Sequence, residues 1–225
     1  MGMIVQHSRG LLLLTLQTYF EPNRSRTGGS GKIIVQIIWV NSIVRYRQLT
    51  MRMKLISEVL NRYYPNPPVP LDHCNLFTFL VSVVLSAQTT DGKVNEVTKE
   101  LFKHATTPHE MAKLDPEFIK SLIKNLGLAP TKAKYVSEMS KQLVCRFGGE
   151  IPNTYEGLES LSGVGHKTAS VIMAQGFNQP SFAVDTHVHR LALRWSLSKE
   201  KKNVNKVQSD LCSLFPKEDW NKVLI

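Results

Sequence analysis

The chain has 225 residues, 42% of them hydrophobic and 20% charged, so it can bury a core as one globular unit or as two small lobes. Its formal charge of +10 favours a polyanionic partner, nucleic acid first, because a basic surface attracts phosphate. The longest apolar stretches fall short of the roughly 18 residues that span a bilayer, so no membrane anchor is expected. Cys74, Cys145 and Cys212 are widely spaced, which predicts neither a disulfide framework nor a metal cluster and favours a reducing compartment.

The N-terminal quarter differs from the rest in charge and in pattern. Residues 1–54 contain eight Lys and Arg against one acid, Glu21, whereas residues 55–225 contain 20 against 17. Residues 33–40 have a β-like apolar pattern, and orderly helical patterning begins only after residue 53. We therefore predict that residues 1–53 are an extension that is unstructured or not native. A basic, acid-poor organellar transit peptide is the alternative.

The remainder of the chain is patterned as helices joined by Gly, Pro, Asp and Asn turns. Residues 54–64 place apolar side chains on one face and end at a proline-rich stretch. Residues 75–104 start with Asn75 as an N-cap candidate and predict a central buried helix, a break near residues 89–92 and an amphipathic helix. Further helical units are expected over 108–127, 131–149, 154–163, 165–177, 185–197 and 203–215. A βαβ fold would need alternating strands that this stretch lacks, so the fold class is predicted to be all-α.

The segment SLSGVGHKTASVI, residues 160–172, predicts a helix, a tight Gly-Val-Gly turn and a second helix. It is not a P-loop, because His166 rather than glycine precedes Lys167 and no strand leads into the turn; a dinucleotide site fails for the same lack of a strand. The backbone N–H groups of such a turn, at the positive end of a helix dipole, can bind a phosphate. An ordinary helix–helix corner would not explain the lysine.

Four motifs in order carry a family resemblance: LSAQTTD (85–91), IKNLGLAPTKA (123–133), LSGVGHKTA (161–169) and FAVDTHVHR (182–190). From about residue 54 to residue 225 the chain resembles the endonuclease III family of helix-hairpin-helix DNA glycosylases. The resemblance implies two helical lobes around a DNA-binding cleft. It also implies a base-excision-repair glycosylase with AP lyase activity, which removes oxidised pyrimidines and cleaves 3′ to the abasic site by β-elimination through a lysine Schiff base.

The same resemblance divides the chain into segments. Residues 54–68 would form an N-terminal helix that packs with the C-terminal lobe. Residues 69–179 would form a six-helix lobe with the helix-hairpin-helix, and residues 180–225 an incomplete C-terminal lobe.

The resemblance assigns the catalytic pair to Lys167 and Asp185. An amine that attacks C1′ of the sugar has to be neutral, whereas a free lysine with a pKa of about 10.4 is protonated at neutral pH. The sequence is expected to place Lys167 near the positive N-terminal end of a helix, an unfavourable position for a positive charge. Asp185 is expected to accept a proton from the amine and to stabilise positive charge that develops on the sugar. Capping of the helix that begins at Thr186 is a second role for Asp185, and the two roles can coexist.

A base within a duplex has to be extruded before it can be cleaved, and the gap has to be filled. The resemblance implies that Gln88 and Leu128 insert into the opened stack. The plainer alternatives are that Gln88 caps a helix end and that Leu128 belongs to the core. The hairpin residues expected to contact DNA are Gly163, Val164, Gly165 and His166.

No cofactor is supported by the residues present. Members of the family commonly carry a four-cysteine 4Fe-4S loop near the C-terminus, and its cysteines are missing here, so the resemblance implies a chain truncated before that loop. His187 and His189 do not indicate a metal site, because positions i and i+2 of a helix point to different faces.

The expected partner is double-stranded DNA that contains a damaged base or an abasic site. The protein is expected to act as a monomer in the bacterial cytoplasm, associated with the nucleoid, or in an organelle if residues 1–53 are a transit peptide. Two other functions stay open: a monofunctional mismatch glycosylase, which would lack the lysine nucleophile, and a non-catalytic helix-hairpin-helix DNA-binding protein.

Overall fold

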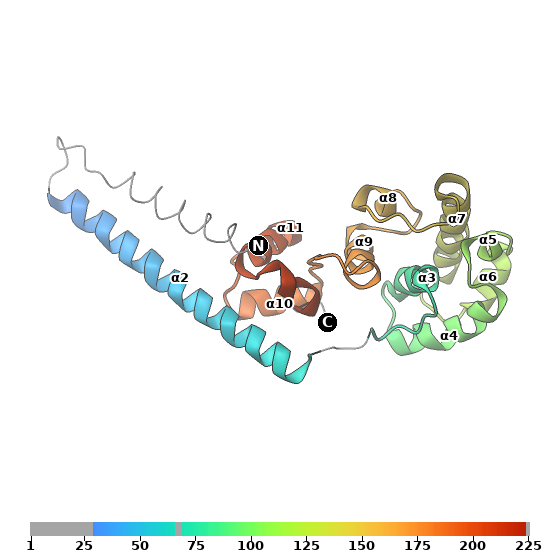
Figure 1. Cartoon of the computed structure of the whole chain (residues 1–225), viewed down its shortest axis with the longest axis horizontal. Coiled ribbons are helices and arrows are strands. Elements are labelled where there is room, and N and C mark those ends of the chain that lie inside the picture. Colours follow the sequence, from blue (N-terminus) through green and yellow to red (C-terminus); the bar gives the residue numbers. More distant parts are fainter. Residues whose placement is uncertain (1–28, 66–68, 224–225) are drawn as a thin grey trace. The chain divides into compact units, whose positions relative to one another are not determined.

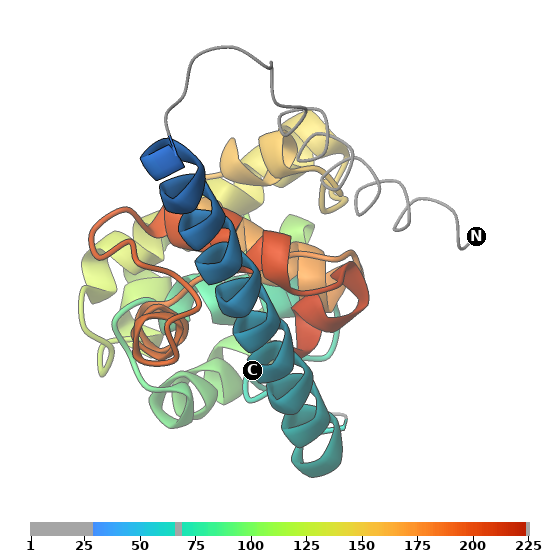
Figure 2. The same ribbon diagram turned by 90° about the vertical axis from the view of Figure 1, so that its left-hand side faces the viewer.

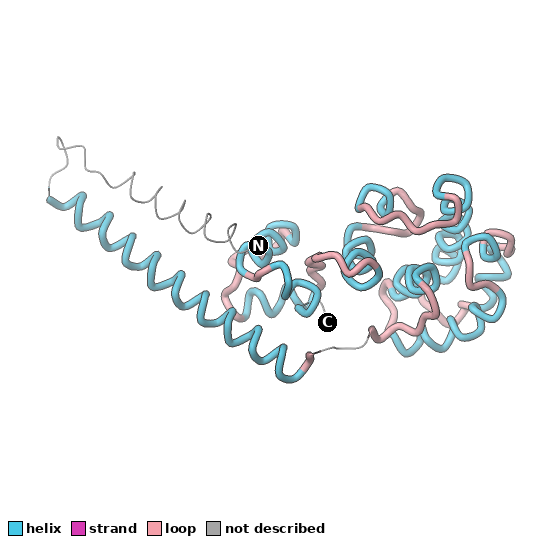
Figure 3. The backbone as a smooth tube through the Cα atoms, viewed as in Figure 1, coloured by secondary structure: helices cyan, strands magenta, loops and turns pink. Residues whose placement is uncertain are grey.

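The computed structural model describes residues 29–65 and 69–223, and within these ranges every regular element is helical (Figure 3). The all-α prediction is therefore confirmed. The chain divides into two compact units, Met1–Gln48 and Leu49–Ile225. None of the described helices is long and apolar enough to cross a membrane.

The helix α2 begins much earlier than the sequence pattern indicates. It runs from Gly29 to Tyr63 as one uninterrupted helix in both views (Figures 1 and 2), so the β-like reading of residues 33–40 and a helical start near residue 54 are wrong. The physical reason is that residues 32–63 contain neither glycine nor proline, so nothing stops the helix from propagating. Residues 1–28 lie outside the described residues, and the transit-peptide alternative stays a prediction.

The helix α3, Leu76–Ser86, is the centre of the first hydrophobic cluster. All of its residues from Phe77 to Leu85 are buried. Asn75 begins the helix with a capping box: its side chain accepts from the Thr78 N–H at 2.8 Å, and the Thr78 hydroxyl accepts from the Asn75 N–H at 3.0 Å. The predicted buried helix and its N-cap are confirmed. The amphipathic helix α4, Asp91–His104, follows after a short turn.

The predicted unit over residues 108–127 is two helices, α5 (Pro108–Met111) and α6 (Pro116–Leu122). The chain breaks between them because Asp115 caps α6, accepting from the Glu117 N–H at 3.0 Å, and Pro116 starts the new helix. The long helix α7, Ala129–Phe147, then ends at Gly148, which adopts φ 62° as predicted for a C-cap glycine.

The predicted helix–turn–helix is present as α8, Tyr155–Glu159, and α9, His166–Val171. The helix α9 continues directly into a π-helical turn, η1, Ile172–Gly176, in which the Phe177 N–H donates to the Ile172 carbonyl at 3.1 Å. Such turns are rare and occur often at functional sites. This one lies directly after the segment that carries Lys167.

A second hydrophobic cluster is built by the C-terminal helices. These are α10 (Thr186–Arg194), α11 (Val204–Leu214), the 3-10 turn η2 (Lys217–Asp219) and α12 (Trp220–Val223). Met53 and Ile56, near the end of α2, pack against this cluster, and Arg52 donates to the Trp195 carbonyl at 3.0 Å. The end of α2 is thus attached to the C-terminal helices by both apolar and polar contacts.

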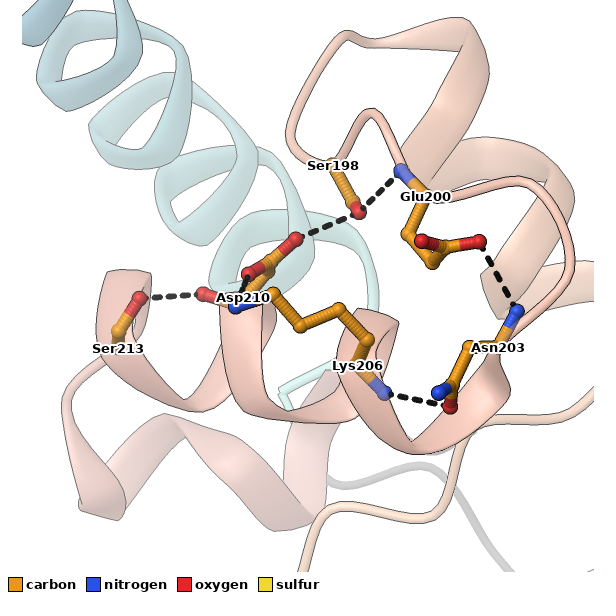
Figure 4. A network of polar contacts seen from close by, with 6 residues as sticks. All are labelled: Ser198, Glu200, Asn203, Lys206, Asp210 and Ser213. Atoms are coloured by element: carbon orange, nitrogen blue, oxygen red, sulfur yellow. Dashed lines mark hydrogen bonds and ion pairs between the residues drawn. The ribbon is translucent and has the colours of Figure 1, made fainter.

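The loop between α10 and α11 is held by polar contacts (Figure 4). The Ser198 hydroxyl donates to Asp210 at 2.7 Å, and this hydrogen bond lowers the pKa of the Asp210 carboxyl. Glu200 accepts the N–H groups of Lys202 and Asn203. These contacts fix the backbone of the loop, and Leu197 in the same loop is buried in the second hydrophobic cluster.

Candidate active site

The turn between α8 and α9 requires a glycine at position 163. Gly163 has φ 79°, and a Cβ built there would lie 2.8 Å from Cβ of Tyr135 on α7. Val164 is buried, and its N–H donates to the Leu161 carbonyl at 3.1 Å. The turn is therefore pressed against α7, and its conformation and its packing both exclude a side chain at Gly163.

The helix α7 also holds this turn by hydrogen bonds. The Ser162 N–H donates to Oε1 of Gln142 at 2.7 Å, and the Ser162 hydroxyl donates to Oε2 of Glu138 at 3.2 Å. Arg146 donates to the Ser160 carbonyl at 3.4 Å. Three successive turns of α7 thus fix the backbone that leads into α9.

Neither the backbone conformation nor the packing at Gly165, the second glycine of the motif, requires a glycine. Gly165 has φ −96° and ψ 176°, which any residue can adopt, and a Cβ built there would meet nothing within 4 Å. Because the protein itself does not demand glycine at this position, its small size leaves room for something outside the protein to approach the backbone.

Gly163→Ala is expected to lower the free energy of unfolding by about 2 kcal/mol, since the left-handed backbone alone costs a non-glycine residue roughly 1–2 kcal/mol. In a domain of this size that is a fall in Tm of roughly 4–8 °C, measurable by calorimetry. Gly165→Ala is the matched control and should cost only about 0.5 kcal/mol, from a poorer N-cap. Equal stability of the two variants would contradict the packing of Gly163 on Tyr135.

The His166 side chain is turned toward α8. Its Nδ1 lies 2.7 Å from Oε1 of Glu159, and its ring stacks on Tyr155 with 5.3 Å between centroids. A neighbouring carboxylate is unfavourable for an anion, so His166 would contact a phosphate through its backbone N–H rather than its imidazole.

Lys167 is the second residue of α9 and is exposed. Two and three positions further along the helix, Ala169 and Ser170 are buried and anchor it. Within the described residues the Lys167 amine has no hydrogen bond and no ion pair. An amine presented in this way is available to a ligand and is not committed to the fold.

Asp185 caps α10, as the sequence predicts. Its Oδ1 accepts both the His187 N–H at 2.9 Å and the Val188 N–H at 2.7 Å. For Oδ2 the described part of the chain provides no hydrogen-bond partner. One carboxylate oxygen therefore fixes the side chain, and the other keeps its lone pairs for a further contact.

No direct contact in the described chain joins Lys167 and Asp185; their segments are linked by Tyr155. The Tyr155 hydroxyl lies 2.6 Å from the Ser181 hydroxyl and donates to the Ser170 hydroxyl at 3.4 Å. Ser170 is three residues after Lys167, Ser181 is four residues before Asp185, and both serines are buried. Nothing in the sequence pattern marks Tyr155, because both contacts depend on the folded backbone.

The two residues expected to insert into DNA both have positive φ and exposed side chains. Gln88 has φ 56° and follows the C-cap of α3, and Leu128 has φ 60° and immediately precedes α7. Leu128 is 58% exposed, which excludes the alternative that it belongs to the core. Positive φ is uncommon outside glycine and asparagine, and such residues cluster at ligand sites.

Comparisons with known proteins show the family of the chain. A model of the HhH-GPD superfamily of base excision DNA repair proteins matches residues 81–217. Endonuclease III of Bacillus subtilis is 40% identical over 158 residues, which cover 70% of this chain and 72% of the relative. Endonuclease III of Treponema pallidum is 43% identical over 163 residues, which cover 72% of this chain and 77% of the relative.

Solved structures give the same result. A trapped endonuclease III–DNA covalent intermediate matches with a TM-score of 0.73 and 34% identity over 77% of this chain and 82% of that one. A thermostable thymine-DNA glycosylase matches with a TM-score of 0.68 at 18% identity, over 80% of this chain and 84% of that one, and shows the fold alone.

The fold and the hairpin thus define a helix-hairpin-helix base-excision DNA repair protein, and the chain belongs to the HhH-GPD superfamily. Within that superfamily it belongs to the endonuclease III family of DNA glycosylases with AP lyase activity. The family predicted from the four motifs is confirmed.

The residues of this chain do not fit the iron–sulfur cluster that the resemblance implies. A 4Fe-4S cluster takes four cysteine thiolates, and the chain has three cysteines, all with free thiols. Across residues 29–65 and 69–223, no three His, Cys, Asp or Glu side chains lie together as a metal site would require.

Proposed function

We propose that this protein removes oxidised pyrimidines from duplex DNA and then cleaves the strand 3′ to the abasic site, with Lys167 as nucleophile. The observation that carries the proposal is the exposed Lys167 amine, which has no polar partner among the described residues and lies beside the glycine hairpin in a chain of the endonuclease III family. The solved structures that this chain resembles include a trapped endonuclease III–DNA covalent intermediate.

The proposed reaction uses the Lys167 amine as nucleophile and the Asp185 carboxylate as proton acceptor. The Lys167 Nζ attacks C1′ as the N-glycosidic bond breaks and the base leaves with the bonding electrons. Loss of a proton from the nitrogen and opening of the sugar give a Schiff base. The iminium withdraws electrons from C2′, whose proton is then lost while the 3′ phosphate leaves. Asp185 would accept the amine proton and stabilise positive charge on the sugar through Oδ2.

The hairpin is proposed to hold a DNA phosphate. Residues 55–225, which include the hairpin, carry only 20 Lys and Arg against 17 acids, so placed N–H groups of the turn, aided by the helix dipole, would supply much of the grip. Gly165→Ala would put a methyl group at the phosphate position while leaving the fold intact. It is therefore the variant that separates binding from stability, and it should weaken duplex binding as measured by fluorescence anisotropy.

The two exposed turns are proposed to enter the opened stack. Gln88 would occupy the space of the extruded nucleotide, and Leu128 would separate the neighbouring base pairs. A monofunctional mismatch glycosylase or a non-catalytic binding module has no use for Lys167, and no contact in the described chain favours either.

The acting species is proposed to be a monomer, because one chain supplies every proposed site residue and both buried clusters. Its proposed location is the bacterial cytoplasm, where chromosomal DNA lies.

The test is borohydride trapping on two duplexes, one with a single oxidised pyrimidine and one with a preformed abasic site. Both should give a covalent protein–DNA adduct, and an undamaged duplex should give none. Trapping on the abasic duplex alone would overturn the lesion class and leave the lyase. Trapping on neither would overturn the proposed function.

A further inference from the structure

Lys132, on the first turn of α7, is a buried amine that the proposed mechanism does not use. It is 3% exposed, and its Nζ donates to the Thr89 hydroxyl at 2.7 Å. No carboxylate of the described chain forms an ion pair with it. Burial lowers the pKa of the Lys132 ammonium, which is the sign of an unfavourable position for a charge. An apolar side chain would be the simpler choice here, so the amine requires an explanation.

The Thr89 contact holds the turn that carries Gln88. The Thr89 N–H donates to the Ser86 carbonyl at 3.0 Å, and Ala87 has φ −54° and ψ 118°. With Gln88 at φ 56°, these angles define a type II turn, whose third position normally takes glycine. The turn is therefore strained at Gln88, and its last residue is fastened to α7 by the Lys132 side chain.

The Lys132 backbone holds the other turn. Its N–H donates to the Leu128 carbonyl at 3.0 Å, and this is the first hydrogen bond of α7. Leu128 is left-handed as well, at φ 60° and ψ 28°, so it too depends on its surroundings to keep its conformation. One residue thus fastens both of the strained, exposed turns, although they are about forty residues apart in the chain.

We propose that Lys132 is a positioning residue that holds the Gln88 turn and the Leu128 turn at a fixed separation, so that both side chains can enter the DNA stack together. The inference rests on the proposed function, in which these two side chains fill the opened stack. It assigns Lys132 no contact with the reacting atoms. Its effect is therefore confined to substrates whose base has to be extruded from a duplex.

Two variants remove the contact from opposite sides. Lys132→Met keeps most of the apolar stem and loses the donor, and Thr89→Val keeps the volume and loses the acceptor. In both, amide hydrogen exchange in residues 86–90 should become faster in the free protein. Base removal from duplex DNA should fall about ten- to a hundredfold, since a displacement of about 1 Å can have that effect on a rate. Cleavage at an abasic site in single-stranded DNA should change less than about twofold, because no base has to be extruded.

The double variant completes the experiment. It should be little slower than the slower single variant, because the contact between Lys132 and Thr89 is already lost and Thr89→Val otherwise removes only the long 3.4 Å hydrogen bond from the Thr89 hydroxyl to the Ala87 carbonyl. Unchanged exchange in residues 86–90, or an equal loss on single-stranded and duplex substrates, would overturn the proposal. Should Lys132→Met fail to fold, Thr89→Val carries the test, since it leaves Lys132 in place. A wild type inactive on all DNA would reject the proposed function, and the exchange measurement would still decide whether Lys132 holds the turn.

Discussion

Lys167→Gln is expected to abolish the borohydride-trapped adduct and to slow strand cleavage by at least about a thousandfold, which is about 4 kcal/mol of transition-state stabilisation. Glutamine retains the approximate length of the side chain and has no nucleophilic amine. Because Lys167 is exposed and makes no polar contact within the described residues, the variant should melt at the wild-type temperature.

The matched control is Lys141→Gln. Lys141 is an exposed lysine on α7, and its replacement removes the same charge from the surface. It should leave trapping intact, so a general loss of positive charge cannot mimic the effect of Lys167→Gln. An adduct that persists in Lys167→Gln would assign the nucleophile to another amine.

Asp185→Asn should retain binding to damaged duplex and lose about a hundredfold or more of turnover, the usual range for a positioned proton acceptor. The amide oxygen of asparagine can still accept the His187 and Val188 N–H groups, so the cap of α10 survives while the charge is removed. Single-turnover kinetics with saturating protein measure the chemical step separately from binding.

Asp185→Ala separates the two roles of the residue. It removes both the cap and the charge, so it should also lower the free energy of unfolding by about 1 kcal/mol. Its Tm should therefore fall by roughly 2–4 °C below that of Asp185→Asn, while both variants are equally slow. Normal turnover in Asp185→Asn would reject the proposed proton transfer and leave Asp185 a capping residue.

The helices that the sequence predicted well are those with chemical start and stop signals. Asn75, Gly148 and Asp185 each mark a helix end through a local interaction, either a side-chain cap or a left-handed glycine. The helix α2 has no such signal between residues 32 and 63. The apolar run at residues 33–40 was wrongly interpreted as β-like because such a run can form either a strand or a helix.

The residues of the site also differ in whether a local sequence signal marks them. Lys167, Asp185 and the glycines could be found because they lie in short motifs. Tyr155 and Lys132 could not, since their polar contacts join residues 15, 26 and 43 positions apart, and such pairs leave no periodic trace in one sequence. Sequence alone also treats Gly163 and Gly165 alike, whereas the structure shows that only Gly163 is required by the fold.

The helix α7 connects sites that would otherwise be considered separately. Its first turn holds Gln88 and Leu128 through Lys132, and its middle turns hold the hairpin through Tyr135, Glu138 and Gln142. A small displacement of α7 would therefore misplace, at the same time, the two side chains proposed to enter the DNA stack and the turn proposed to bind a phosphate. Substitutions in its buried face, such as Val136→Ala, would then imitate active-site defects although they touch no DNA. Loss of activity in variants of α7 should therefore be attributed first to displacement of the two turns and the hairpin that this helix holds.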